Sequence, residues 1–200
     1  MKIFNLKDFR SGWQFYEDDI ADLREGLTNL DYKWEWSRFV ASIAQGVDYF
    51  YSRASHYDDT WKDPHWLNPI YNIINHANEI PYGLTNEWNH CLVNRYGPGH
   101  TLSLHQDDEH CLEGSILSVS IGGTAQFRYT LDRYQPGNTI TLSDLDCILA
   151  DGQWWRDNWH SVINGDKERF NLTFRRIKTP LASNGAVSYT HLRAHETLTD

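Results

Sequence analysis

The sequence has no long apolar run. No stretch approaches the ~18 uninterrupted apolar residues that a membrane-crossing helix needs. The N-terminus, Met1 to Phe4, leads into polar sequence rather than into the apolar core of a signal peptide. We therefore expect a cytoplasmic protein without a membrane partner.

Cysteine is also scarce. The chain has three cysteines, Cys91, Cys111 and Cys147, which are odd in number and far apart. This spacing suggests neither a disulfide framework nor a C-x-x-C zinc site.

Basic residues are fewer than acidic ones, with 18 Lys+Arg against 27 Asp+Glu and a formal net charge of -9. A broad basic surface for tight, nonspecific binding of duplex phosphates is therefore not expected. Any contact with nucleic acid must be local. Aromatic residues are plentiful instead, and nine Trp, eleven Tyr and eight Phe could serve a core or a stacking surface.

The C-terminal end differs in character from the rest. From about Ala186 it reads AVSYTHLRAHETLTD, which is polar, has no hydrophobic period and resembles a translated sequencing adapter. An ordinary solvated tail is the alternative. At 200 residues one domain is the default, so we expect a single domain over 1–183 and a non-native tail over 184–200.

Two segments before residue 88 have apolar residues at helical spacing. A helix is predicted over 17–30, opened by three acidic residues that suit a first turn. A second helix is predicted over 67–80, entered through Asn68-Pro69 and ended near Pro81. The segment 39–51 fits neither the helical nor the strand period, and 61–69 is predicted to be a loop.

After residue 88 the apolar period falls to two. Short alternating segments, separated by turns such as Tyr96-Gly97-Pro98-Gly99, lie at 88–96, 101–107, 115–121, 125–131, 139–142, 146–150, 159–163 and 169–177. Short strands after two helices predict a mainly β fold of the α+β class. We expect a jelly roll or barrel with the N-terminal helices packed on its outside.

A metal-ligand pattern lies on one predicted strand. Side chains two apart share a face of a strand, so His105 and Asp107 converge on one point. His160 on a later strand offers a third ligand, and two His with one carboxylate leave open positions on non-haem iron(II). The pattern also occurs at His56-Tyr57-Asp58, and histidines without a metal remain the alternative.

A second polar face lies on the last predicted strand. Arg169, Asn171, Thr173 and Arg175 share it by their spacing of two, and the apolar residues between them take the other face. A half-buried strand with its polar face in water would look the same. The planar guanidinium groups of Arg169 and Arg175 would also suit the binding of a dicarboxylate such as 2-oxoglutarate.

Two runs carry a family resemblance. Residues 89–107, NHCLVNRYGPGHTLSLHQD, and 169–175, RFNLTFR, resemble the two signature blocks of the AlkB family of iron(II)/2-oxoglutarate nucleic-acid demethylases. The second run matches R-x-N-x-T-F-R at every fixed position, and SILSVSIGGTAQFRY between them resembles the family's central strands. The likeness covers about 88–177. The interval from His160 to Arg169 is shorter than in familiar members, and the N-terminal substrate lid matches poorly.

The resemblance implies a double-stranded β-helix over about 88–178. It implies that His105, Asp107 and His160 bind iron(II), with 2-oxoglutarate and dioxygen as cosubstrates. The implied 2-oxoglutarate cradle consists of Asn94, Tyr96, Arg169, Asn171 and Arg175. Within it Arg169 is the expected partner of the distal carboxylate.

Substrate contacts are implied at five further positions. Glu109 is expected to face the exocyclic amino group of a damaged base, and Arg133 in a turn to contact a phosphate. Tyr51 and Tyr57, together with Trp61, are candidates for stacking on a flipped base. A solvated acid, a surface Arg and core aromatics are the respective alternatives.

The implied activity is oxidative demethylation of 1-methyladenine and 3-methylcytosine in single-stranded DNA or RNA by a monomeric enzyme. One alternative keeps the oxygenase chemistry and changes the substrate to RNA only, a protein or a small molecule. The other is a metal-binding jelly-roll module without turnover.

Overall fold

The fold is described from a computed structural model of the chain. The described residues are 1–8, 17–35, 37–44, 50–51, 55–56, 65–68, 70, 88–109 and 111–178. Side chains are not described at 44, 50, 51, 55 and 56. Within these ranges no helix is long and apolar enough to cross a membrane.

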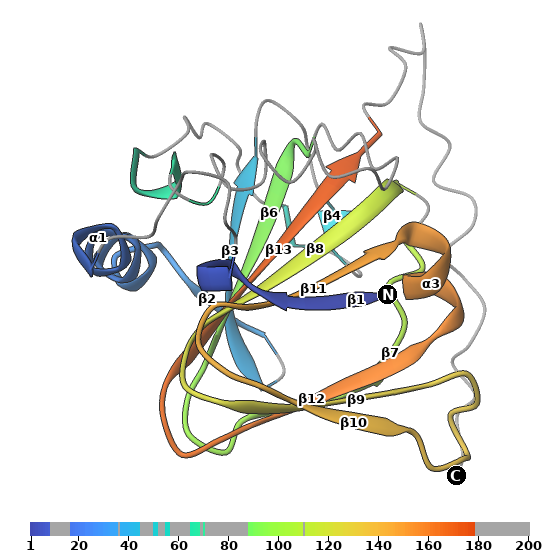
Figure 1. Ribbon diagram of the computed structural model, residues 1–200. Helices are drawn as coiled ribbons and strands as arrows, with labels where there is room; N and C mark the ends of the chain where they lie inside the picture. The colour runs from blue at the N-terminus through green and yellow to red at the C-terminus, as the bar shows by residue number, and fades with distance from the viewer. Residues whose placement is uncertain are drawn as a thin grey trace, which may run out of the picture.

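Two antiparallel sheets form the body of the molecule. The larger has seven strands in the order β1 (Lys2–Asn5), β11 (Asp146–Asp151), β8 (Leu112–Gly122), β13 (Arg169–Ile177), β6 (His90–Tyr96), β3 (Arg38–Ala44) and β2 (Lys33–Glu35). The smaller has four, in the order β10 (Asn138–Leu142), β9 (Ala125–Thr130), β12 (Trp159–Asn164) and β7 (Thr101–His105). Figure 1 shows the smaller sheet below the larger one. A separate two-stranded pair joins β4 (Phe50–Tyr51) to β5 (Ser55–His56).

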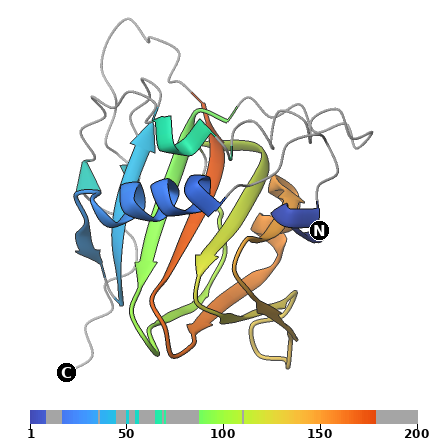
Figure 2. The same cartoon turned by 60° about the vertical axis from the view of Figure 1, so that its left-hand side comes forward.

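Helices are few and short among the described residues. They are the 3-10 turns η1 (Leu6–Asp8) and η2 (His65–Leu67) and the α-helices α1 (Glu17–Thr28) and α3 (Gly152–Asp157). Figure 2 shows α1 lying across the outer face of the larger sheet. Its Leu23 and Leu27 are fully buried there, in one cluster with Ile43 and Val93 of the sheet.

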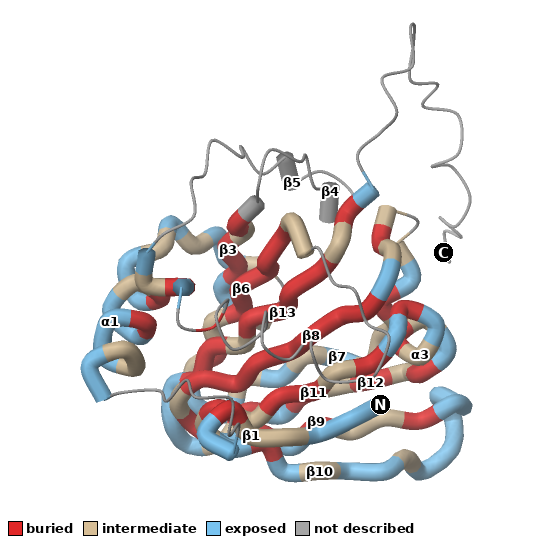
Figure 3. The backbone as a smooth tube through the Cα atoms, turned by 45° about the horizontal axis from the view of Figure 1, so that its top comes forward, coloured by how far each residue is buried: buried red, intermediate tan, exposed pale blue. Residues whose placement is uncertain are grey.

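The larger sheet has an apolar cluster on each face. The outer cluster includes Phe170, Leu172 and Phe174 of β13 together with the buried side of α1. The second cluster joins residues of both sheets, including Ile116 of β8 and Phe127 of β9. Figure 3 shows the central strands as buried and β10 as largely exposed. Because both faces of the larger sheet are covered, a polar residue on its inner face is shielded from bulk water.

The expected architecture is confirmed. Each segment predicted to be a strand after residue 88 forms one, and the first predicted helix is present as α1. Most of the second predicted helix lies outside the described residues, as does the C-terminal tail from 179.

Seven elements were not expected. They are strands β1 to β5, the 3-10 turn η1 and the short helix α3. In addition, the segment predicted to be a loop over 61–69 contains η2.

Candidate active site

A pocket lies between the two sheets. It holds about 510 Å³ of empty space, part of which is open solvent, and side chains from both sheets line it. Along β6 and β13, the side chains that point toward the pocket alternate with apolar side chains that belong to the outer cluster. The polar residues of both strands therefore lie together on the pocket side.

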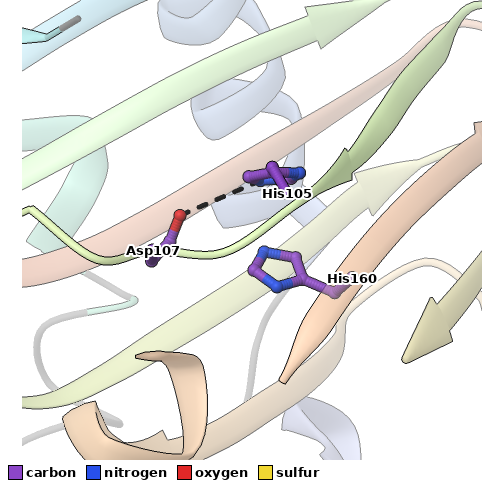
Figure 4. Close-up of side chains that lie close together, drawn as sticks. All are labelled: His105, Asp107 and His160. Atoms are coloured by element: carbon purple, nitrogen blue, oxygen red, sulfur yellow. Dashed lines mark ion pairs between the residues drawn. The ribbon is translucent and has the colours of Figure 1, made fainter. Parts of the chain in front are cut away.

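One wall of the pocket carries a cluster of three possible metal ligands. His105 ends β7 and lies directly opposite His160 of the neighbouring β12, while Asp107 follows two residues after His105. One ligand atom from each of the three residues lies within 4.8 Å of the others. Figure 4 shows the three side chains converging, with His105 Nε2 3.8 Å from Asp107 Oδ1. The structure brings the 105–107 copy of the H-x-D pattern together with His160, while Tyr57 and Asp58 of the other copy lie outside the described residues.

Backbone hydrogen bonds orient both imidazoles. The Nδ1 of His105 lies 2.8 Å from the carbonyl oxygen of Ser103, and that of His160 lies 3.2 Å from the carbonyl oxygen of Asn158. A carbonyl oxygen only accepts, so each Nδ1 carries the proton and donates. The neutral ring then keeps its Nε2 lone pair for a metal, which is how second-layer partners set the tautomer of a histidine ligand.

Burial keeps His160 neutral. Its ring packs against Trp155, with ring centroids 5.0 Å apart, and against Phe127 at 5.7 Å. Burial lowers the pKa of His160 to about 4, and the negative charge of Asp107 only partly opposes this. Neutral imidazole is the form that binds metal, so a proton does not compete for this ligand at neutral pH.

Asp107 is held as a carboxylate. Burial on its own would raise its pKa, but the nearby charge of Arg175, helped by His160, His105 and Arg38, lowers the pKa below its usual value. The Nη2 of Arg175 lies 3.4 Å from Asp107 Oδ2. Its Nη1 lies 3.7 Å from Glu109 Oε1, so Arg175 faces two acidic side chains at once.

The opposite wall holds the residues expected to form the cradle. In the register of β13 and β6, Arg169 lies opposite Tyr96 and Asn171 opposite Asn94. All four side chains and Arg175 line the pocket. The structure thus brings the predicted cradle positions together across the pocket from the histidines.

Arg169 carries the clearest sign of a missing anionic partner. It is 1% exposed, its Nε donates to Ser120 Oγ at 2.6 Å, and its Nη2 donates to Asn171 Oδ1 at 3.0 Å. Its Nη1 is buried without a hydrogen-bond partner among the described residues. Burial lowers the pKa of Arg169 to about 10, with Tyr96 opposing, so the group stays charged at neutral pH.

The cluster and the cradle fit iron(II) and 2-oxoglutarate. A buried donor without a partner costs ~1–3 kcal/mol, and a ligand carboxylate at Arg169 would remove that cost. On the other wall, two imidazoles and one carboxylate form the donor set of non-haem iron(II) sites with open positions.

Three polar residues that line the pocket or hold a residue lining it were not predicted. Ser118 donates to Asn171 Oδ1 at 2.8 Å, and Ser120 accepts from Arg169. Both alternate with apolar residues along β8, which is the signal that could have identified them. Arg38 of β3 is 2% exposed and donates from Nε to Asn94 Oδ1 at 2.6 Å. No sequence pattern marks it.

The residues expected to contact the substrate are not brought together as closely as the metal-ligand cluster and the cradle residues. Glu109 is partly buried beside Arg175 near the cluster. Arg133 lies on the exposed turn between β9 and β10, with its guanidinium over the rings of Trp159 at 4.9 Å and Tyr134 at 5.3 Å. Tyr51 lies on β4 and its side chain is not described.

Tyr57 and Trp61 lie outside the described residues. Stacking on a flipped base therefore stays a prediction for all three aromatic residues.

Comparison with known proteins finds similarity over a region of the sequence that includes the residues of the pocket. The model of the 2OG-Fe(II) oxygenase superfamily matches residues 24–175. The RNA replication polyprotein of Apple stem pitting virus is 30% identical over 166 residues, which are 80% of this chain and 7% of that protein. The RNA-directed RNA polymerase of Lolium latent virus is 28% identical over 141 residues, 69% of this chain and 8% of that protein.

Bacterial relatives match a shorter part of the chain at higher identity. The alpha-ketoglutarate-dependent dioxygenase AlkB of Escherichia coli is 45% identical over 97 residues, which are 43% of this chain and 44% of that protein. The chain therefore spans less than a tenth of these viral relatives and less than half of this bacterial one. The resemblance to AlkB proteins is confirmed.

Solved structures agree in fold. The structure of OsALKBH1 superposes with a TM-score of 0.61 at 18% identity, covering 87% of this chain and 97% of that one. This likeness confirms the jelly roll. The superfamily's reaction uses iron(II), 2-oxoglutarate and dioxygen, which agrees with the His-Asp-His cluster in the pocket.

Proposed function

The chain belongs to the 2OG-Fe(II) oxygenase superfamily, and from this premise we propose that it oxidatively removes N-methyl groups from the bases of single-stranded nucleic acid. One observation carries the proposal. The His105, Asp107 and His160 cluster shares a pocket with Arg169, whose buried Nη1 has no partner among the described residues. A metal and a dicarboxylate can thus be held within one space, as this chemistry requires.

Iron(II), when bound, supplies the oxidising chemistry in which dioxygen and 2-oxoglutarate become succinate and carbon dioxide while a methyl carbon is hydroxylated. The residues of the chain position the reactants. The imidazoles of His105 and His160 and the carboxylate of Asp107 would bind the metal from one wall, and Arg169 would orient the dicarboxylate from the other. The hydroxymethyl group formed on the base nitrogen then leaves as formaldehyde and restores the base.

Glu109 is proposed to recognise the base. Its carboxylate lies two residues beyond Asp107, is 23% exposed and is 3.7 Å from Arg175, which helps to hold it in place. A carboxylate accepts from an amino group, as in acidic readout of the cytosine amino group. Adenine and cytosine carry such a group beside the methylated nitrogen, so 1-methyladenine and 3-methylcytosine are the proposed lesions.

A single strand of RNA is the proposed preferred polymer. With a formal charge of -9 the chain has little long-range attraction for duplex phosphates, and an unpaired base costs least to place in a pocket. The similarity to viral proteins named for RNA replication favours RNA over DNA. Methylated DNA single strands should react as well, because a pocket that reads only the base does not exclude deoxyribose.

The test is a panel of single-stranded RNA and DNA oligomers, each with one methyl lesion, scored by loss of a methylene in the mass spectrum. We expect turnover on 1-methyladenine and 3-methylcytosine. Glu109→Gln should lose the preference among bases while retaining decarboxylation of 2-oxoglutarate without substrate. Glu113→Gln is the matched control, because Glu113 pairs with Arg176 at 2.7 Å, whereas Glu109 lies beside Arg175 next to the metal-ligand cluster.

No demethylation of any oligomer, while 2-oxoglutarate is consumed with a peptide or metabolite, would leave the oxygenase and remove the nucleic-acid substrate. Metal binding without consumption of 2-oxoglutarate under any condition would instead favour a binding module.

A further inference from the structure

We propose that Gln106 is a positioning residue of the metal site, and that it holds Asp107 in place by anchoring the chain to the helix α3. The inference rests on the metal site of the proposed function and not on the proposed substrate. It gives a role to the middle residue of the H-x-D pattern, whose amide is not one of the three candidate metal ligands.

Asp107 lies beyond the strand that positions the two histidines. His105 is the last residue of β7 and pairs with His160 of β12, so a β-ladder fixes both rings. The chain leaves this ladder at Gln106, and residues 106–109 belong to no described helix or strand. The backbone that carries the third ligand must therefore be held by other contacts.

The end of α3 supplies two of these contacts, from consecutive carbonyl groups. Gln106 Nε2 donates to the carbonyl oxygen of Arg156 at 2.6 Å, and the backbone N–H of Asp107 donates to the carbonyl oxygen of Trp155 at 3.3 Å. The last carbonyl groups of a helix have no partner within the helix. Gln106 and Asp107 therefore use acceptors that α3 leaves open, and the side-chain bond is the shorter of the two.

The helix α3 is a firm anchor because it is packed against both sheets. It follows β11 of the larger sheet directly and precedes β12 of the smaller sheet by one residue. A Cβ atom at Gly152 would lie 2.6 Å from the carbonyl oxygen of Gly114 in β8, so the helix begins in close contact with the larger sheet. At its other end Trp155 is 3% exposed, with its ring centroid 5.0 Å from that of His160.

The carboxylate of Asp107 faces two walls of the pocket at once. Its Oδ1 lies 3.8 Å from His105 Nε2, and its Oδ2 lies 3.4 Å from Arg175 Nη2. The charge of Arg175 attracts the carboxylate away from the histidines whether or not a metal is bound. Asp107 can serve the metal and contact Arg175 together only while its backbone stays in place. Loss of the Gln106 anchor should therefore weaken the metal site although all three ligands remain.

The experiment measures metal affinity rather than turnover. Calorimetry on the full chain gives the Kd of Mn(II) without 2-oxoglutarate. Gln106→Met keeps the length of the side chain and removes its donor. It should raise the Kd of Mn(II) about tenfold or more, because loss of an outer partner of a metal ligand typically weakens metal affinity by ~10–100-fold.

Gln126→Met is the matched control. Gln126 is exposed on β9 of the smaller sheet, and its Nε2 donates to Thr141 Oγ1 at 2.9 Å. This variant should change the Kd of Mn(II) by less than about twofold. The melting temperature of each metal-free variant should stay within about 4 °C of wild type, because one hydrogen bond of a partly exposed side chain contributes little to the fold. If Gln106→Met does not fold, Gln106→Asn, whose amide is one methylene shorter, takes its place.

A double-mutant cycle shows whether Gln106 acts through Asp107. In an Asp107→Asn background the ligand is already impaired, so Gln106→Met should change the Kd of Mn(II) by less than about threefold. The visible absorption bands of the Co(II)-loaded chain report the set of ligands. In Gln106→Met these bands should shift in the same direction as in Asp107→Asn.

Unchanged binding of Mn(II) in the Gln106 variant would overturn the inference. A full tenfold loss in the Asp107→Asn background would overturn it as well, because Gln106 would then act on another part of the site. So would a fall of the metal-free melting temperature by more than about 10 °C, which would mean that Gln106 acts through the fold. If the wild-type chain bound no Mn(II), the proposed function itself would fail.

Discussion

His160 lies directly opposite His105 on the neighbouring strand, and the centroids of their rings are 4.2 Å apart with the planes at 53°. Two of the three candidate metal ligands are thus fixed by a β-ladder rather than by loops. Asp107 follows where β7 has ended, and the backbone N–H of Asp107 donates to the carbonyl of Trp155 at 3.3 Å. The cluster is therefore built into the smaller sheet and tied to α3.

The first prediction concerns the metal. Replacement of His105, Asp107 or His160 by Ala should each reduce iron-dependent consumption of 2-oxoglutarate by more than about 100-fold. Removal of one of three protein ligands weakens affinity and destroys the open-face geometry. Iron content after dialysis should fall in parallel. His56→Ala belongs to the other H-x-D copy and should behave as wild type, so loss of iron in that variant alone would refute the assignment.

The second prediction concerns the cosubstrate. Arg169→Ala should raise the 2-oxoglutarate concentration needed for half-maximal turnover by two orders of magnitude or more. The loss of a bidentate arginine from a desolvated pocket costs ~2–5 kcal/mol. Arg169→Lys should restore only part of the lost 2-oxoglutarate affinity, because an ammonium group cannot bind a carboxylate through the two parallel hydrogen bonds of a guanidinium. An unchanged 2-oxoglutarate requirement in Arg169→Ala would remove this residue from the cradle.

The third prediction concerns the packing of α1. Leu27 is fully buried against the larger sheet, so Leu27→Ala should lower the free energy of unfolding by about 2–5 kcal/mol in urea titrations. Leu131 is 75% exposed, and Leu131→Ala is the control that should change it by less than about 0.5 kcal/mol. Equal effects of the two substitutions would mean that α1 does not pack as described.

The fourth prediction concerns alkaline pH. Burial raises the pKa of Tyr32 well above its ordinary value, against the lowering effect of Arg95, and the hydroxyl donates to the carbonyl of Leu27 at 2.6 Å. The folded chain therefore keeps a proton that the unfolded chain releases above about pH 10. This contribution is complete below that pH and is lost as the pH rises further.

The melting temperature of wild type should consequently fall more steeply between pH 9 and 11 than that of Tyr32→Phe. Buried Cys91, whose pKa is also raised by burial, contributes equally to both chains and cancels in the comparison. Parallel curves for the two chains would contradict the assignment to Tyr32.

Strong local patterns made the second half of the fold predictable. Alternation along segments such as 115–121 and 169–177 marks strands whose two faces meet different surroundings. The short edge strands β1 and β2 carry too few residues for a period to be visible. The helix α3 is only six residues long, and its one local signal is the N-cap Asp151, which accepts from the backbone N–H of Trp154 at 2.7 Å.

The site was predictable to a similar degree. The positions of His105, Asp107 and Arg169 follow from strand spacing and from the resemblance, because motif residues stay together along the chain. Arg38 directly precedes the segment 39–51, which has no clear period, and its place in the pocket depends on the pairing of β3 with β6. Such a long-range register is set by tertiary packing and cannot be obtained from the local sequence.

The most direct test of the account is the coupled product yield on a single-stranded RNA oligomer that carries one 1-methyladenine. With iron(II) and 2-oxoglutarate labelled at the carboxyl group that is lost, carbon dioxide and formaldehyde are measured in the same reaction. The account predicts equal amounts of the two, together with an oligomer lighter by one methylene, and neither product with His160→Ala. Release of carbon dioxide without formaldehyde from this or any other methylated strand would contradict it.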